Sequence, residues 1–176
     1  DEEIAIKNGT FKGDTKEKGT VEFKNVSFKY PDADEYLLKD ISFTAKKGET
    51  VAFIGSTGSG KSTLINLIPR FYDVTDGEVL VDGVDVKEYD EAHLHNKIGY
   101  ISQKAIMFTG TVGENVAYGD NGREKPTEEQ IKKAIEVAQG TDFVEKMDKK
   151  YDAHIARGGT NVSGGQKQRL SIARAI

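Results

Sequence analysis

The 176-residue chain carries a formal net charge of −4, and hydrophobic residues make up 36% of it, which suits a single globular domain with a buried core. The acidic balance gives no support to non-specific nucleic-acid binding, and the absence of cysteine excludes disulfides and thiolate metal sites. No apolar run approaches the roughly 18 residues that a membrane-spanning helix needs, and the acidic start is unlike a secretory signal. We therefore expect the segment to stay on the side of the membrane where it is made, which still allows it to be part of a membrane protein.

The first third of the chain predicts a linker followed by strands. Residues 1–19 are polar and rich in Gly and Lys, as expected of a lead-in. Apolar and polar residues alternate over 20–30, which predicts half-buried antiparallel strand structure. A polar turn at 31–35 separates it from another strand at 37–45, and Lys47-Gly48 form the next turn.

The stretch from residue 51 to 68 is the most informative part of the sequence. Four apolar residues, Val51–Ile54, predict a short buried strand. Gly55–Ser62 read GSTGSGKS and match the phosphate-binding pattern G-x-x-x-x-G-K-[ST]. The apolar residues that follow predict a helix, which Pro69 ends. A plain Gly/Ser turn before an amphipathic helix is the alternative, but the strand–loop–helix context disfavours it.

Each residue type in this loop suits contact with phosphate. The glycines allow a tight turn that presents backbone N–H groups, and the helix start favours an anion. Lys61 can reach terminal phosphates as a point charge, and the Ser62 hydroxyl can bind Mg²⁺. The candidate phosphate-binding residues are the loop and the residue after it: Gly55, Ser56, Thr57, Gly58, Ser59, Gly60, Lys61, Ser62 and Thr63.

The middle of the chain predicts short strands and one helix. A turn is expected at Asp76-Gly77, and a hairpin signal lies at Asp82-Gly83. Four polar residues in this part are predicted to have no functional role. We expect Asp82 and Asp85 to be turn residues, and His93 and His95 to lie on solvated surface. The predicted elements are a strand at 78–81 with 84–86 pairing back, a helix at 89–97 and a buried strand at 98–102.

The second half is predominantly helical in pattern. A short helix is expected at 111–118, and another at 141–149. Thr127 with Gln130 three residues later is a capping-box signature for the helix between them. Its apolar residues share one face at helical spacing, namely Ile131, Ala134, Ile135 and Ala138.

A second motif lies about a hundred residues after the phosphate loop. Ser163 can cap a helix whose first amides, freed of side chains by two glycines, can point at an anion. Ser-Gly-Gly alone is a common loop sequence, but here it runs into QKQRLSIARAI. The motif consists of Asn161, Val162, Ser163, Gly164, Gly165 and Gln166.

Together the two motifs resemble the nucleotide-binding domain of ATP-binding-cassette (ABC) transporters. The family signature usually reads LSGGQ, and here it reads VSGGQ. The resemblance covers roughly residues 19–176 and implies ATP and Mg²⁺ as ligands. It also implies an α/β fold, in which residues 20–102 form an antiparallel β-subdomain and a P-loop NTPase core sheet, and residues 103–176 form a helical subdomain.

The resemblance assigns roles to two residues outside the motifs. Tyr30 matches the aromatic residue that stacks on adenine, and Gln103 matches the glutamine implied to contact magnesium and the attacking water. Without the family, Tyr30 is read as a strand-end tyrosine that anchors a turn, and Gln103 as a loop residue. The candidate catalytic residues are therefore Lys61 and Gln103, and the candidate metal ligands are Ser62 and Gln103.

Other segments resemble exporter-type members of the family. Residues 108–119 are similar to FSGTIRENIAYG-like segments of exporter-type cassettes. Residues 159–161, directly before the signature, also resemble the exporter-type sequence. Arg157 stands where many exporters carry a glutamate that touches the membrane domain, and this departure puts that contact in doubt. The resemblance implies a second nucleotide-binding domain and a transmembrane domain as partners, a place at the cytoplasmic face of the membrane, and no nucleic-acid partner.

The family pattern also places a magnesium-ordering aspartate, a water-polarising glutamate and a switch histidine after the signature helix, and none is present up to Ile176. On this pattern we expect a C-terminally incomplete domain that does not turn over ATP by itself. The alternatives are a non-transport ABC-type ATPase and a non-hydrolysing regulatory nucleotide-binding module. The transported substrate cannot be read from this sequence.

Overall fold

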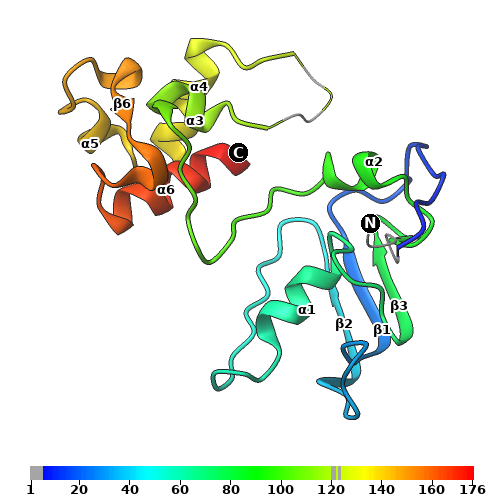
Figure 1. Cartoon of the computed structure of the whole chain (residues 1–176). Coiled ribbons are helices and arrows are strands. Elements are labelled where there is room, and N and C mark those ends of the chain that lie inside the picture. The colour runs from blue at the N-terminus through cyan, green and yellow to red at the C-terminus, as the bar shows by residue number, and fades with distance from the viewer. Residues whose placement is uncertain (1–5, 120–121, 123) are drawn as a thin grey trace. The chain divides into compact units, whose positions relative to one another are not determined.

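The computed structural model describes residues 6–119, 122 and 124–176, and these form two compact units (Figure 1). The described residues up to 98 form the first unit, and those from 99 onward form the second. The predicted subdomain boundary at residue 103 lies a few residues further along the chain. The mixture of an antiparallel sheet with helices confirms the α/β class.

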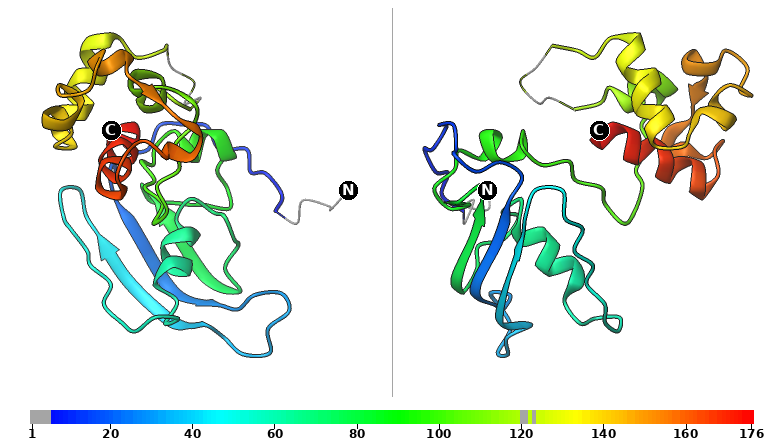
Figure 2. Two further views of the ribbon diagram at one scale, coloured as in Figure 1. Left: turned by 60° about the vertical axis from the view of Figure 1, so that its left-hand side comes forward. Right: turned by 180° about the vertical axis from the view of Figure 1, so that it is seen from behind.

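A four-stranded antiparallel sheet forms the first unit (Figures 1 and 2). Its spatial order is β2-β1-β3-β4. The strands predicted at 20–30, 37–45, 78–81 and 84–86 and the hairpin at Asp82-Gly83 are confirmed. The strands are β1 Val21–Phe28, β2 Leu38–Ala45, β3 Asp76–Val81 and β4 Val84–Asp85.

The pairing of β1 is irregular where its apolar pattern breaks. Its core residues Phe23 and Val26 lie three apart rather than two, and the register shifts between them. Asn25 takes a left-handed conformation there, with φ of 48°. A bulge of this kind restores the inward direction of the next apolar side chain.

Gly77 belongs to β3, so the turn predicted at Asp76-Gly77 is wrong. A Cβ on Gly77 would collide with the backbone oxygens of Lys24 and Asn25, and its φ is +82°. Glycine at this position therefore allows β3 to approach β1 closely beside the bulge, a common role of glycine within strands.

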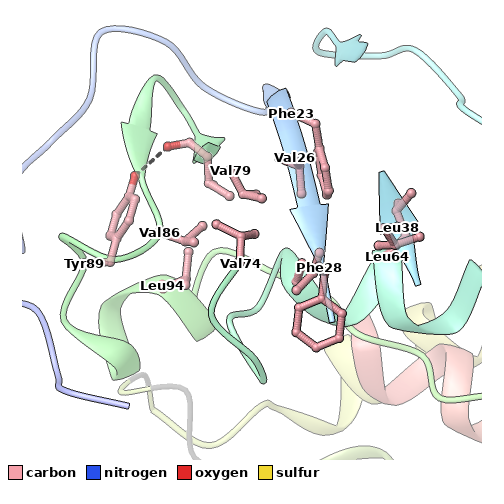
Figure 3. Close-up of a cluster of buried hydrophobic side chains, with 12 residues drawn as sticks. Phe23, Val26, Phe28, Leu38, Leu64, Val74, Val79, Val86, Tyr89 and Leu94 are labelled. Carbon is pink, nitrogen blue, oxygen red and sulfur yellow. Dashed lines mark hydrogen bonds between the residues drawn. The ribbon is translucent and has the colours of Figure 1, made fainter. Parts of the chain in front are cut away.

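Helix α1, Lys61–Leu67, lies alongside the sheet in the views of Figures 1 and 2 and confirms the predicted helix. Leu64 and Leu67 bury their side chains in the core of this unit. Figure 3 shows this core and the buried hydroxyl of Tyr89, which donates to the Val81 carbonyl at 2.9 Å. The other buried members are Phe23, Val26, Phe28, Leu38, Val74, Val79, Val81, Val86 and Leu94.

The buried strand predicted at Val51–Ile54 is wrong for this structure. These residues form no helix or strand among the described residues, and 97% of the Ile54 surface is exposed. A strand is stable only when a neighbour satisfies its backbone groups, and the described strands pair elsewhere. An apolar run alone therefore does not make a strand.

Part of the predicted lead-in is fixed on the first unit. Phe11 N donates to Glu88 O at 2.8 Å, and Asp90 N donates to Phe11 O at 3.0 Å. The Phe11 ring meets Tyr89 edge-on with centroids 5.2 Å apart. Residue 11 thereby joins the start of helix α2, Glu91–His95, to the core.

The two histidines of α2 are half-buried, so the prediction of solvated surface is wrong for them. His95 Nε2 lies 2.8 Å from Pro69 O. The His93 ring stacks on Tyr89 at 6.0 Å, and its Nε2 finds no hydrogen-bond partner among the described residues. The described residues contain no group of three His, Cys, Asp or Glu that could hold a metal.

The second unit is built mainly from short helices. The helices predicted at 111–118, after Thr127 and after Ser163 are confirmed, whereas the helix predicted at 141–149 ends at Val144. The buried strand predicted at 98–102 is wrong, because this segment forms no described strand and Ile101 is 46% exposed. No described helix is long and apolar enough to cross a membrane. The elements are β5 Gly110–Thr111, α3 Val112–Val116, α4 Glu128–Val137, α5 Thr141–Val144, η1 Lys150–Asp152, β6 His154–Ile155, η2 Arg157–Gly159 and α6 Gly164–Ala175.

A separate core holds these helices together. Ile135 and Ala138 of α4 are buried as the helical spacing predicts, and Leu170 and Ala173 of α6 pack with them. Strands β5 and β6 pair antiparallel through Gly110–Ile155 and Thr111–His154. The core also contains Met107, Val112, Val116, Val144, Ala153, Ile155 and Val162.

Candidate nucleotide-binding site

The candidate phosphate loop runs directly into α1. Gly58 and Gly60 take left-handed φ values of 82° and 88°. A Cβ on Gly58 would meet no described atom within 4 Å, whereas one on Gly60 would lie 2.8 Å from Leu38 Cδ2. Gly58 therefore leaves space on the open side of the loop, and Gly60 allows the loop to pass close to β2.

Lys61 lies folded over the loop. Its ammonium donates to Gly55 O at 2.8 Å, Ser56 O at 2.6 Å and Ser59 Oγ at 3.2 Å. Oxygen atoms thus surround the cation on the loop side. A lysine held in this way is already positioned at the centre of the loop, where an anionic group would meet it.

The start of α1 can receive an anion. Gly60 is its N-cap residue, and within the described part of the chain no side chain caps it. Its first N–H groups are therefore available to a ligand. Ser62 is exposed and lies in the first turn. A serine hydroxyl beside phosphate oxygens suits Mg²⁺, which prefers oxygen ligands and keeps several waters.

Tyr30 follows β1 and reaches α1. Its hydroxyl lies 2.9 Å from Thr63 Oγ1, and its ring meets Phe28 and Tyr72 in T-shaped contacts at 5.0 and 5.4 Å. Tyr30 remains 37% exposed, so part of the ring is accessible. The structure brings the candidate base-stacking residue and the candidate phosphate loop onto one unit. Tyr72 also contacts Phe28 and Tyr30, although no sequence motif marks it as part of the site.

The signature residues lie at the start of α6 in the second unit. Ser163 Oγ accepts from Gln166 N at 3.2 Å, and Gln166 Oε1 accepts from Ser163 N at 2.9 Å. At both Gly164 and Gly165 a Cβ would meet no described atom within 4 Å. Val162, at the position of the usual leucine, is buried in the core. The Ser163 and Gln166 side chains thus cap the start of α6, while no described atom fills the space beside Gly164 and Gly165.

The segment before the signature is also fixed. Asn161 Oδ1 accepts from Ala156 N at 2.9 Å, and its Nδ2 donates to His154 O at 2.7 Å. Lys167 Nζ donates to Gly158 O at 2.9 Å. Arg157 is the first residue of η2. These contacts hold Ser163 at the head of α6.

Gln103 is exposed and lies in a bend between α2 and β5. It belongs to the second unit, whereas the phosphate loop belongs to the first. Its contact with magnesium and water therefore stays a prediction.

Comparison with known proteins decides the family. A sequence model described as ABC transporter matches residues 38–176. The chain belongs to the ABC transporter family. Family membership implies that it binds ATP, in agreement with the loop of the first unit.

Individual ABC relatives extend this comparison. The chain is 46% identical, over 99% of its length, to a candidate multidrug export ATP-binding/permease protein of Staphylococcus aureus strain NCTC 8325, and equally to its counterpart in strain COL. A solved structure of a bacterial Atm1-family ABC exporter with ATP bound is 33% identical, with a TM-score of 0.87 over 99% of this chain. The chain spans 30% of the length of each of these proteins.

Proposed function

We propose that this chain is the ATP- and Mg²⁺-binding part of an exporter-type ABC transporter ATPase, placed at the cytoplasmic face of the membrane. The observation that carries the proposal is the position of the Lys61 ammonium, held by loop oxygens at the uncapped start of α1. The similarity to export ATP-binding/permease proteins over nearly the whole chain supports the exporter type.

When phosphate binds at this loop, the Lys61 ammonium would exchange its present hydrogen-bond partners for phosphate oxygens. The Lys61 ammonium now donates to two carbonyl oxygens and one hydroxyl. Phosphate oxygens carry full negative charge and accept stronger, charge-assisted hydrogen bonds. The amides at the start of α1 add further donors, so the β- and γ-phosphates of ATP are the groups that fit best.

Two residues are proposed to hold the metal. The Ser62 hydroxyl would bind Mg²⁺ beside the phosphates, and Gln103 would complete the contact and orient the attacking water. When bound, Mg²⁺ supplies neutralisation of the charge on the phosphate oxygens. Lys61 contributes to the same neutralisation from the protein side.

The signature requires a second nucleotide-binding domain in this proposal. The open amides at Gly164 and Gly165 would meet ATP held by the phosphate loop of the partner, in a homodimer or heterodimer. Closure of two such domains around two ATP molecules would drive a transmembrane domain, and hydrolysis would reset it. No nucleic acid has a role in this scheme.

Two rival functions are a non-transport ABC-type ATPase and a regulatory module that binds nucleotide without turnover. The export proteins among the relatives disfavour the first. Nucleotide-dependent transport by the whole protein separates both rivals from the proposal, since neither rival moves a substrate across a membrane.

The direct test measures ATP affinity of the whole protein by calorimetry with Mg²⁺. Lys61→Ala removes the charge-assisted hydrogen bonds to phosphate, worth about 1.5–3 kcal/mol, so we expect roughly ten- to a hundredfold weaker binding. Lys47→Ala, which removes a lysine from an exposed turn of the same unit, is the matched control. Equal affinity in the Lys61 variant and the parent would reject the site.

A further inference from the structure

Tyr30 is held at both ends of its side chain. Its hydroxyl pairs with Thr63 Oγ1 at 2.9 Å, and Thr63 is 93% buried in the first turn of α1, with 7% of its surface exposed. The aromatic ring lies against Phe28, which is 3% exposed. Tyr30 remains 37% exposed, so part of the residue is left to a ligand.

The third contact of Tyr30 comes from Tyr72, in the turn that follows α1. Tyr72 meets the Tyr30 ring at 5.4 Å with the ring planes at 89°. Next to Tyr72, Arg70 forms an ion pair with Asp73, with Nε 2.7 Å from Oδ1 and Nη2 3.2 Å from Oδ2, and its Nη1 donates to Lys87 O. This bidentate pair spans the turn that carries Tyr72 and limits its movement.

We infer that the Tyr30–Thr63 hydrogen bond is a positioning contact that sets the base-stacking ring relative to the phosphate loop. The inference rests on the proposed ATP-binding function, together with the stacking of adenine on Tyr30 that the resemblance to the ABC family implies. Thr63 immediately follows Lys61 and Ser62, so its hydroxyl fixes the distance between the ring and the phosphate-binding residues. Thr63 is the positioning residue, and Tyr30 is the residue that contacts the base.

The energetic reason is preorganisation. A tyrosine side chain that is free to rotate loses conformational entropy when a base stacks on it. Here the hydroxyl contact, with Phe28 and Tyr72 at the ring, fixes the side chain before the nucleotide binds. Loss of the hydroxyl should therefore weaken binding of the base while leaving the ring and the phosphate loop intact.

The test compares ATP with inorganic tripolyphosphate, which carries the phosphates without a base. In the whole protein with Mg²⁺, we expect Tyr30→Phe to weaken ATP about three- to tenfold, the size of one neutral hydrogen bond. Tripolyphosphate affinity should stay within about twofold, because the loop is unchanged. Tyr36→Phe is the matched control: Tyr36 is also 37% exposed and donates to Asp76 at 2.8 Å, and its loss should leave both affinities unchanged.

The partner residue provides the second arm. The ratio of ATP to tripolyphosphate affinity should fall in Thr63→Val by the same factor as in Tyr30→Phe, and no further in the double variant, because both remove one contact. Thr63→Ser keeps the hydroxyl and should restore the parent ratio. This ratio is insensitive to a general loss of folded protein, which lowers both affinities together.

Three results would overturn the inference: an unchanged ratio in Tyr30→Phe, an equal loss of ATP and tripolyphosphate binding, or additive losses in the double variant. Failure of the proposed function has a different signature. If Tyr30→Ala leaves the ATP affinity unchanged, Tyr30 does not stack on the base at all. If Tyr30→Ala weakens ATP binding while Tyr30→Phe does not, stacking holds and the positioning contact is excluded.

Discussion

Asp82 is a buried carboxylate at the hairpin between β3 and β4, with 8% of its surface exposed. Burial by itself raises the pKa of this carboxyl, but hydrogen bonds from the backbone of Thr20 and Gly19 and from the Lys97 ammonium outweigh it and lower the pKa below its ordinary value. The distances from Oδ1 to Thr20 N and from Oδ2 to Lys97 Nζ are both 3.1 Å. The charged form of Asp82 therefore stabilises the hairpin.

The sign of the pH dependence follows from this lowered pKa. The stabilisation is fully present above the ordinary carboxyl pKa, near about 4, and is lost as the pH falls through the lower folded value. Asp82→Asn keeps an acceptor for Thr20 N and tolerates the φ of 53° at this position, but it removes the charge. We expect it to destabilise β1 and β3 by about 1–3 kcal/mol at pH 7, and progressively less below pH about 4.

Hydrogen–deuterium exchange of peptides that cover β1 and β3 measures this effect in the whole protein. Asp85→Asn is a control from the same hairpin, since Asp85 is less buried and accepts only a local bond from Lys87 N among the described contacts. A difference between the Asp82 variant and the parent that is as large well below pH 4, where the Asp82 carboxylate becomes protonated, as at pH 7 would contradict the ionic explanation.

Asn115 is the corresponding buried polar residue of the second unit, at 1% exposure. Its Nδ2 donates to Phe108 O at 2.9 Å and Thr111 O at 3.0 Å, while its Oδ1 accepts from Phe108 N at 2.8 Å. Arg174 of α6 donates from Nε to Asn115 O at 2.7 Å and lies over the Phe108 ring. One amide thus fixes the segment before α3, and its backbone joins α3 to α6.

We expect Asn115→Ala to destabilise the second unit by about 2–4 kcal/mol, because partly buried backbone groups of Phe108 and Thr111 lose their partner. Exchange protection of peptides from α3 and α6 should fall, while that of β1 and β3 in the first unit should not. Asn96→Ala, at an exposed helix end, is the control. Unchanged protection in α3 and α6 would show that the amide is dispensable.

At the scale of elements, α6 combines a good cap with two poor helix formers. Its capping box stabilises the start, yet glycine at the first two helical positions, Gly164 and Gly165, costs stability relative to alanine by up to about 1 kcal/mol each. The space above both glycines contains no described atom within 4 Å of a Cβ. Folding of this unit therefore does not require glycine there.

Gly165→Ala should accordingly separate folding from function. We expect α6 to be as stable as in the parent or slightly more stable, because alanine is the better helix former. ATP-driven association of two nucleotide-binding domains should weaken, because the added methyl occupies the approach to the amides. Thermal unfolding and sizing chromatography with ATP measure the two effects, and destabilisation of α6 would show that glycine is there for the fold.

At the scale of the whole molecule, we propose that two nucleotide-binding domains share each ATP site. The phosphate loop belongs to the first unit, and the signature belongs to the second. Ser163→Arg places a bulky cation at the head of α6, so we expect it to abolish ATP-driven association while leaving ATP affinity of a single domain within about twofold of the parent.

Sizing chromatography and calorimetry with ATP distinguish the outcomes of this change. Arg169→Ala, on an exposed position of the same helix, is the control and should associate like the parent. Association of the Ser163 variant equal to that of the parent would exclude a signature role for Ser163 across the interface.

The sequence by itself determined the features that depend on neighbours in the chain. The capping box at Thr127 and the cap at Ser163 form as predicted, because each joins residues only three apart. The loop before α1 and the hairpin at Asp82-Gly83 are equally local. The two motifs were sufficient to identify the family. The spacing of residues within the phosphate loop was sufficient to propose which of them bind phosphate.

The tertiary structure alone decided the features that need partners from distant segments. The apolar run at Val51–Ile54 satisfies every local rule for a buried strand, but no described strand supplies the partner that its backbone requires. The hydroxyl contact between Tyr30 and Thr63 and the amide of Asn115 were not foreseen for the same reason. Burial and hydrogen bonding between residues far apart in the chain depend on how the elements pack, and local pattern does not encode that packing.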